Sequence, residues 1–117
     1  ALAIDIELRR PLLSAGFGGL SGPAIKPVAL RAVCELYGTL DVPIVGCGGI
    51  TSWRDAVEFF LAGASAVQVG SAVYYKGLGV FKSILKGLES YMEHMGYARV
   101  ADMVGGAVSE LVRPREG

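Results

Sequence analysis

Hydrophobic and polar positions alternate between two periods along the middle of the chain. Residues 42–47 form a short apolar run rich in β-branched side chains, and residues 66–69 form another; both are too short for a helix and indicate buried strands. Between them, apolar positions follow helical spacing. Ser52 can cap the start of this helix, and Asp55 three residues later can complete a capping box with it. Gly63 is a usual helix terminator. We predict a strand, a helix and a second parallel strand.

Two further helices are predicted around this unit. Apolar positions at helical spacing predict a helix from Ala24 to Tyr37, opened by Pro23 and ended by Gly38. A later amphipathic helix carries an apolar stripe and runs to about Met95 before Gly96. Its stripe consists of Phe81, Ile84, Leu85, Leu88 and Met92.

The two ends of the chain carry weaker signals. Apolar and charged residues alternate from Ile4 to Arg9, which predicts a half-exposed strand that Arg10-Pro11 breaks, with Leu12-Leu13 returning as the second arm of a small hairpin. Towards the other end, residues 72–75 predict one helical turn and residues 97–104 a last short helix. Residues 105–117 are predicted to form a loose tail.

The order of strands and helices with short loops predicts an α/β fold with a parallel sheet, whose strands are buried on both faces. Only two such strands are clear, whereas a (β/α)₈ TIM barrel needs roughly 250 residues. We therefore expect the C-terminal portion of such a barrel, its last two to three β/α units, which is incomplete alone. In this interpretation residues 1–22 form a hairpin and loop, residues 23–104 the β/α units, and residues 105–117 the tail.

Composition excludes several functions. The formal net charge is zero without a basic run, so a nucleic-acid-binding surface is not expected. No apolar stretch reaches the roughly 18 residues of a membrane span, so we expect no membrane association. Cys34 and Cys47 lack the spacing of a metal site, and no metal is expected. We interpret both as reduced thiols of a cytoplasmic protein.

Glycine is the most informative residue type. The chain has 17 glycines in 117 residues, about twice the average usage of roughly 7%. They gather at predicted loop ends: Gly48-Gly49 follows the first buried strand and Gly70-Ser71 the second. Backbone N–H groups in such loops can approach and bind a phosphate, because no side chain keeps it away. The pattern predicts a phosphate site between the two loops.

Three segments together resemble the dihydroorotate dehydrogenase family, specifically the NAD-linked 1B type of class 1 and its catalytic subunit. They are GGLSGPAIKP at residues 18–27, PIVGCGGI at residues 43–50 and AGASAVQVGS at residues 62–71. The first is the most specific, and the resemblance covers residues 1–104. It implies a TIM barrel that holds FMN at the carboxyl ends of its strands. It also implies oxidation of dihydroorotate to orotate in pyrimidine biosynthesis.

The resemblance also implies site residues. Gly22, Gly48, Gly49, Gly70 and Ser71 match positions that contact FMN, the last four mainly at its phosphate. No catalytic residue is expected in this chain, because the family's cysteine base and substrate-binding asparagines belong to upstream strands. The chain alone is therefore expected to be inactive.

The remaining candidate residues are expected to have structural roles, and the resemblance implies several partners. Cys47 is expected to be a small buried side chain rather than a base, His94 a solvated helix residue, Lys26 more often structural than functional, and Trp53 part of the barrel exterior. The resemblance implies three partners: the upstream half of the barrel, further copies of the same protein, and an electron-transfer subunit with an iron–sulfur cluster and FAD.

Two alternatives stay open at this point. Dihydropyrimidine dehydrogenases and dihydrouridine synthases share the GGI and AGASAVQVG runs, so another FMN barrel is possible, although the GGLSGPAIKP run favours the first assignment. A non-catalytic half-barrel that associates through its open strand edges is the second alternative.

Overall fold

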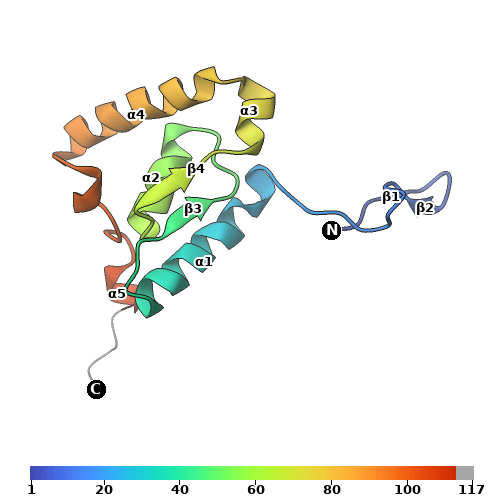
Figure 1. Ribbon diagram of the computed structural model, residues 1–117, viewed down its shortest axis with the longest axis horizontal. Helices are drawn as coiled ribbons and strands as arrows, with labels where there is room; N and C mark the ends of the chain where they lie inside the picture. Colours follow the sequence, from blue (N-terminus) through green and yellow to red (C-terminus); the bar gives the residue numbers. More distant parts are fainter. Residues whose placement is uncertain (113–117) are drawn as a thin grey trace.

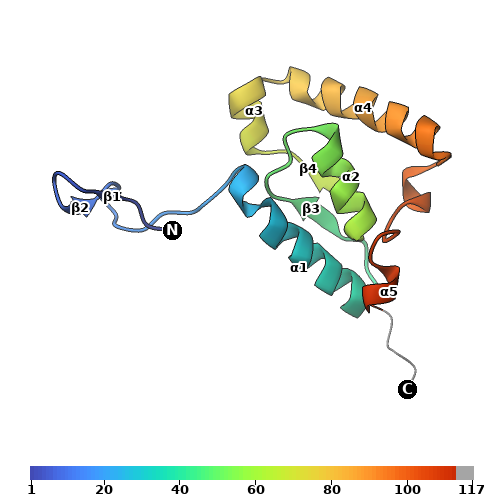
Figure 2. The same cartoon turned by 180° about the vertical axis from the view of Figure 1, so that it is seen from behind.

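A computed structural model describes residues 1–112, and it shows a parallel β-strand pair with helices packed around it and a hairpin that projects to one side (Figures 1 and 2). The hairpin consists of β1 (Ile4–Asp5) and β2 (Arg10–Pro11). The remaining elements are η1 (Pro23–Ile25), α1 (Lys26–Thr39), β3 (Val45–Cys47), α2 (Trp53–Ala62), β4 (Ala66–Gln68), α3 (Ser71–Lys76), α4 (Gly79–Met95), η2 (Val100–Asp102) and α5 (Ser109–Val112).

The β3–α2–β4 unit confirms the predicted α/β arrangement. Strands β3 and β4 are parallel, with Gly46 opposite Val67. Ser52 and Asp55 form the predicted capping box at the start of α2, and Gly63 ends the helix in the left-handed conformation with φ of 119°. These signals depend on neighbouring residues only, which is why the helix bounds agree with the sequence. The first strand is shorter than predicted and begins at Val45 rather than Val42.

The sheet is covered on one face only, so the prediction of strands buried on both faces is wrong for residues 1–112. Gly46 is buried, and a Cβ at this glycine would lie 2.5 Å from the ring of Phe59 on α2. The neighbouring residues in the strands face the other way: Val45 is 52% exposed, and Cys47, Ala66 and Gln68 are also exposed. Cys47 is therefore not the buried side chain that was expected, because it lies on the uncovered face.

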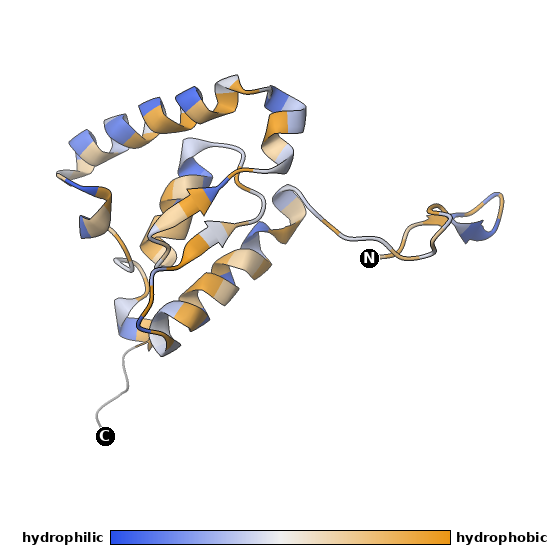
Figure 3. Cartoon of the chain, viewed as in Figure 1, coloured by the Kyte–Doolittle hydropathy of each residue, from blue (hydrophilic) through white to orange (hydrophobic). Residues whose placement is uncertain are grey.

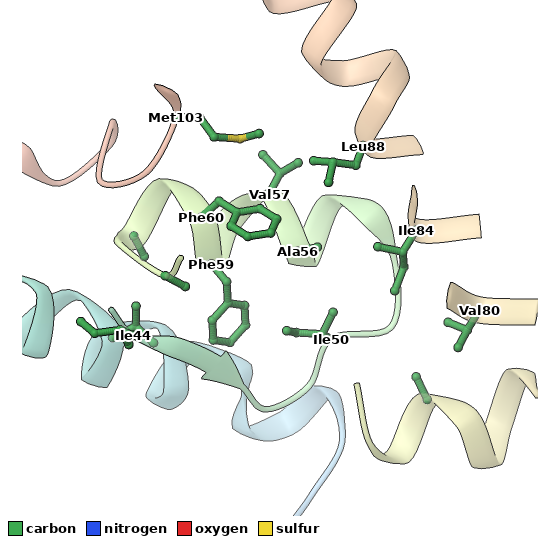
Figure 4. Packing of buried hydrophobic residues seen from close by; sticks show 14 residues of the cluster. Ile44, Ile50, Ala56, Val57, Phe59, Phe60, Val80, Ile84, Leu88 and Met103 are labelled. Carbon is green, nitrogen blue, oxygen red and sulfur yellow. The ribbon is translucent and has the colours of Figure 1, made fainter. Parts of the chain in front are cut away.

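The core lies between the sheet, α2 and α4. Phe59 and Met103 have the largest fully buried side chains, and Figure 4 shows Phe59 pointing from α2 towards the strands while Val57 meets Leu88 of α4. The other buried apolar residues are Val33, Ile44, Ile50, Ala56, Phe60, Ala62, Ala64, Ala72, Val80 and Ile84. Burial of these side chains drives the packing of the helices against one face of the sheet.

Helix α4 is amphipathic as predicted, and its buried residues include Ile84 and Leu88 of the predicted stripe, but Val80 is buried in place of Phe81 and Leu85. Val80, Ile84 and Leu88 are buried, whereas Phe81 and Leu85 are 44% and 60% exposed. Figure 3 shows hydrophobic residues on the strands and on the inner side of this helix. The helix has two adjacent apolar rows, and the described residues cover only one of them. Gly96 ends it in the left-handed conformation, as expected.

The hairpin forms with a tighter turn than predicted. Asp5 pairs with Arg10 and Ile4 with Pro11, so Arg10-Pro11 is the second arm and not a break. The Asp5 carboxylate accepts hydrogen bonds from the backbone N–H groups of Glu7 and Leu8 at 3.0 and 2.9 Å. An Asp side chain that binds the backbone two or three residues on stabilises a turn, and it closes the hairpin before Leu12 is reached.

Gly38 does not end its helix, because α1 continues to Thr39. A Cβ at Gly38 would lie 2.6 Å from Cβ of Val112, so this glycine lets α5 approach α1 closely. Residues 105–112 are thus not a loose tail: they include α5, which packs on α1. Residues 113–117 of the predicted tail lie outside the described residues. Within residues 1–112, no helix has both the length and the apolar character to cross a membrane.

Candidate functional site

A cavity of about 140 Å³ lies at the carboxyl ends of β3 and β4. It brings together the loop before α1, the loop after β3 and the start of α3, which are distant in the sequence. Its lining residues are Ser21, Gly22, Ile25, Cys47, Gly48, Gly49, Ile50, Gln68, Gly70 and Ser71. All five residues predicted to bind FMN line this one cavity, which we call the glycine cavity. Their role in binding a cofactor stays a prediction.

The loops before α1 and after β3 touch through their glycines. Gly22, Gly48 and Gly49 have φ of 88°, 134° and 71°, a conformation that side chains with a Cβ rarely adopt. A Cβ at Gly49 would lie 2.8 Å from the carbonyl oxygen of Gly22 and 2.8 Å from Cβ of Lys26. The two loops can approach this closely only because a side chain is missing at Gly49.

The third side of the cavity is the start of α3. Gly70 is the N-cap residue of this helix, so no side chain caps the helix start. A Cβ at Gly70 would meet nothing within 4 Å. The first backbone N–H groups of a helix have no partner within the helix. Ser71 adds a hydroxyl that lies 3.9 Å from the position a Cβ on Gly22 would take. The cavity has no acidic lining residue within residues 1–112, so it can accept an anion of phosphate size.

An ion-pair cluster stands beside the cavity. The Lys26 ammonium lies 2.7 Å from Asp55 and 3.1 Å from Glu58, so the predicted structural role of Lys26 is confirmed. Burial acts to raise the pKa of Asp55, but hydrogen bonds from Lys26 and Thr51 outweigh it and lower the pKa from 3.8 to about 2. The hydrogen bond to Asp55 is the main cause that raises the pKa of Lys26. Asp55 is therefore ionised at neutral pH.

Sequence reasoning missed half of the cavity lining. Gln68 and Cys47 are the last residues of their strands, lie opposite each other in the parallel register and line the cavity. Position along the chain was the available signal: Cys47 ends the first predicted strand directly before Gly48, and Gln68 stands two residues before Gly70 near the end of the second. Ser21, Ile25 and Ile50 carried no such signal.

The other candidate residues lie outside this site. His94 is exposed near the end of α4, as predicted. It lines a separate hollow of about 470 Å³ together with Trp53 and Tyr91. Trp53 packs against α4, because a Cβ at Gly87 would overlap its ring and the rings of Trp53 and Tyr91 are 5.9 Å apart.

The fold and the site define an α/β protein with an anion-sized cavity at the carboxyl ends of its parallel strands. The sequence model of the dihydroorotate dehydrogenase family matches residues 1–92. The chain is 59% identical over 105 residues to the catalytic subunit of dihydroorotate dehydrogenase B (NAD⁺) from Pyrococcus furiosus, which covers 90% of this chain and 35% of that protein. The same subunit from Methanothermobacter thermautotrophicus is 54% identical, with coverage of 89% and 34%.

Solved structures agree with these relatives. A ligand-free DHODH from Eimeria tenella superposes with a TM-score of 0.76 at 30% identity and covers 97% of this chain and 32% of its own. The complex of that species' DHODH with ferulenol gives a TM-score of 0.73 at 30% identity, with coverage of 91% and 28%. The chain therefore belongs to the dihydroorotate dehydrogenase family, which confirms the resemblance. It spans about a third of the length of the curated relatives that it matches.

Proposed function

We propose that this chain is part of an FMN-dependent dihydroorotate dehydrogenase that oxidises dihydroorotate to orotate in de novo pyrimidine biosynthesis. In this proposal the glycine cavity holds the phosphate of FMN through Gly48, Gly49, Gly70 and Ser71, with Gly22 beside them. One observation carries the proposal: residues from three distant segments converge on a single cavity in a chain of this family. A cytoplasmic location stays a prediction.

The cavity fits the phosphate but not the whole cofactor. A dianionic phosphate requires several donors and no competing carboxylate, and the cavity offers helix-start N–H groups, glycine backbone and the Ser71 hydroxyl. Its volume of about 140 Å³ is well below the roughly 300 Å³ at which small-molecule pockets begin. The ring system of FMN would therefore extend beyond the cavity, past Cys47 and Gln68. FMN would supply the chemistry that accepts a hydride.

The uncovered sheet face supports the proposal that the chain works within a larger barrel. Two parallel strands leave unpaired edges, and Val45, Cys47, Ala66 and Gln68 expose one face. Closing a barrel would cover this face and pair both edges. We expect residues 1–112 to form C-terminal β/α units, and the upstream half of the same barrel to supply the remaining strands.

The division of the barrel into this chain and an upstream half also predicts which functions belong to other parts of the enzyme. One well-placed general base contributes about 10² to 10⁴ in rate, and the family's base belongs to the upstream half. The chain alone should therefore give no measurable turnover. The curated relatives are named as catalytic subunits, which supports a partner subunit; we expect it to carry an iron–sulfur cluster and FAD, and we expect the catalytic subunit to form homo-oligomers.

The test is FMN binding by the complete, assembled protein. We expect a flavin absorption spectrum, and Ser71→Ala should raise the Kd for FMN about tenfold, because a hydrogen bond to a charged group is lost. Ser83→Ala removes an exposed hydroxyl outside the glycine cavity and should leave the Kd unchanged.

Three results would contradict the proposal or one of its parts. Protein that takes up no FMN and is isolated only as an oligomer of this chain would favour the non-catalytic half-barrel. An unchanged Kd in Ser71→Ala would remove Ser71 from the phosphate site. Dihydroorotate oxidation by residues 1–117 alone would show that the division of roles between the two halves is wrong.

A further inference from the structure

Four residues that do not line the glycine cavity form one continuous hydrogen-bonded network beside it. Lys76 Nζ donates to the carbonyl oxygen of Thr51 at 2.8 Å. The N–H and hydroxyl of Thr51 donate to Asp55 Oδ2 at 2.9 and 3.1 Å. Lys26 Nζ donates to Asp55 Oδ1 at 2.7 Å. We call this set the Thr51 network.

Each part of the Thr51 network belongs to a segment that carries one side of the cavity. Lys76 ends α3, the helix that begins with Ser71. Thr51 directly follows the glycine loop after β3. Lys26 begins α1, and its backbone nitrogen lies 3.1 Å from the position a Cβ on Gly49 would take. The network therefore ties together the three loops around the cavity.

The geometry points to Asp55 and Lys76 as positioning residues that hold these three loops at the spacing a phosphate group requires. This inference rests on the proposed function, in which the cavity binds the phosphate of FMN. Neither side chain lines the cavity, so both act through Thr51 and not by contact with the cofactor.

The physical reason is the short reach of a hydrogen bond. Donors to an anionic oxygen act at about 2.7–2.9 Å, and a displacement of about 1 Å in one loop is enough to lose them. Asp55 is well suited to prevent such a displacement. Its carboxylate also accepts from the N–H and hydroxyl of Ser52 at 3.0 and 3.1 Å, and its side chain is only 13% exposed.

A variant of Lys76 can test the positioning of the loops without a large effect on folding. It is exposed and makes one hydrogen bond to the residues described, and an exposed interaction of this kind contributes little to folding stability. Its removal should therefore leave the melting temperature nearly unchanged while it frees α3, through the last residue of this helix, from the loop after β3. Asp55 affects both the positioning of the loops and the folding stability, because it also caps α2.

The experiment compares FMN with riboflavin, which lacks the phosphate, as ligands of the complete protein after flavin removal. Fluorescence titration gives the Kd of each ligand, and the melting temperature of each apo-variant is recorded beside it. We expect Asp55→Asn to raise the Kd for FMN about tenfold and Lys76→Met about threefold. The Kd for riboflavin should change less than about twofold in both variants, because only the phosphate contacts depend on the loop spacing.

Two control variants remove comparable groups elsewhere. Asp102→Asn alters another capping carboxylate, at the end of η2, which accepts from the backbone N–H and guanidinium of Arg99 at 3.0 and 2.7 Å. Lys82→Met removes an exposed lysine of α4 that makes no hydrogen bond within residues 1–112. Both should leave the preference for FMN over riboflavin at the wild-type value.

The outcomes distinguish this inference from the proposed function. If the wild-type protein shows no preference for FMN over riboflavin, the phosphate site is wrong and the positioning roles fall with it. If Ser71→Ala removes the preference and Lys76→Met and Asp55→Asn both keep it, the positioning roles alone are wrong. Equal weakening of FMN and riboflavin would also overturn them, since it indicates a general loss of structure. If Asp55→Asn does not fold, Lys76→Met decides the question.

Discussion

Two glycines of the cavity should respond differently to the same added methyl group. Gly49 and Gly70 both line the cavity, but they differ in backbone conformation and in free space. Gly49 has φ of 71°, and its Cβ would stand 2.8 Å from the Gly22 carbonyl oxygen. Gly70 has φ of −112°, and its Cβ would meet nothing within 4 Å. We predict that Gly49→Ala harms folding and binding, and that Gly70→Ala harms binding alone.

The expected changes in stability and binding follow from this geometry and the usual energetic costs of strain and overpacking. A left-handed conformation costs an alanine about 1–2 kcal/mol, and overpacking against a rigid neighbour adds about 1–3 kcal/mol. Because the contact at Gly49 is with backbone, it cannot relax by side-chain rotation, and Gly49→Ala should lose roughly 2–5 kcal/mol of unfolding free energy. Gly70→Ala should stay within about 0.5 kcal/mol of the wild type. Its methyl group enters the glycine cavity, where the proposed function puts the phosphate of FMN, so the Kd for FMN should rise at least about tenfold.

Denaturant unfolding of the apo-protein measures the first quantity, and FMN titration of the folded protein measures the second. Gly79→Ala is a matched control, since its Cβ would also meet nothing within 4 Å and it does not line the cavity. The reasoning is refuted if Gly49→Ala is as stable as the wild type. It is also refuted if Gly70→Ala binds FMN normally, because Gly70 would then not face the bound phosphate.

Two further predictions concern the surroundings of the site. The pKa of Asp55 is lowered from 3.8 to about 2, so its contribution is complete above pH 4 and is lost as the pH falls towards 2; we expect a loss of about 1–2 kcal/mol over this interval. Denaturant unfolding at several acidic pH values gives the unfolding free energy as a function of pH. This free energy should fall less steeply with pH in Asp55→Asn than in the wild type, and an equal dependence on pH would contradict the assigned cause. A Cβ at Gly87 would overlap the ring of Trp53, so Gly87→Ala should lower the unfolding free energy by about 1–3 kcal/mol. Unchanged stability in a urea titration would show that the ring moves aside freely.

The parts of the fold that could be predicted depend on near neighbours in the sequence. The capping box of Ser52 and Asp55 fixes the start of α2, and Gly63 fixes its end. The two apolar runs predict parallel strands because a helix of suitable length lies between them. Since the carboxyl ends of such strands meet at one edge, the glycines that follow them could be assigned to one site from the sequence alone.

The parts that could not be predicted depend on distant segments. Gly38 looks like a helix terminator, but it serves the close approach of α5, which lies near the other end of the chain. The exposure of Cys47 depends on which face of the sheet the helices cover. The exposure of Phe81 and Leu85 on α4 has the same origin, because the contact with α2 covers the neighbouring row of Val80, Ile84 and Leu88. Local pattern carries no information on these contacts.

The chemistry of the cavity lining supports the proposal that the cavity binds a phosphate group. Within residues 1–112 the lining contains hydroxyl, amide, thiol, apolar and glycine groups, and no carboxylate, imidazole or amine. Backbone donors and glycines can hold an anion in a defined position without taking or giving a proton. In the proposed function such a site positions the phosphate of FMN, and we expect the acid–base step to require residues from the upstream half of the barrel.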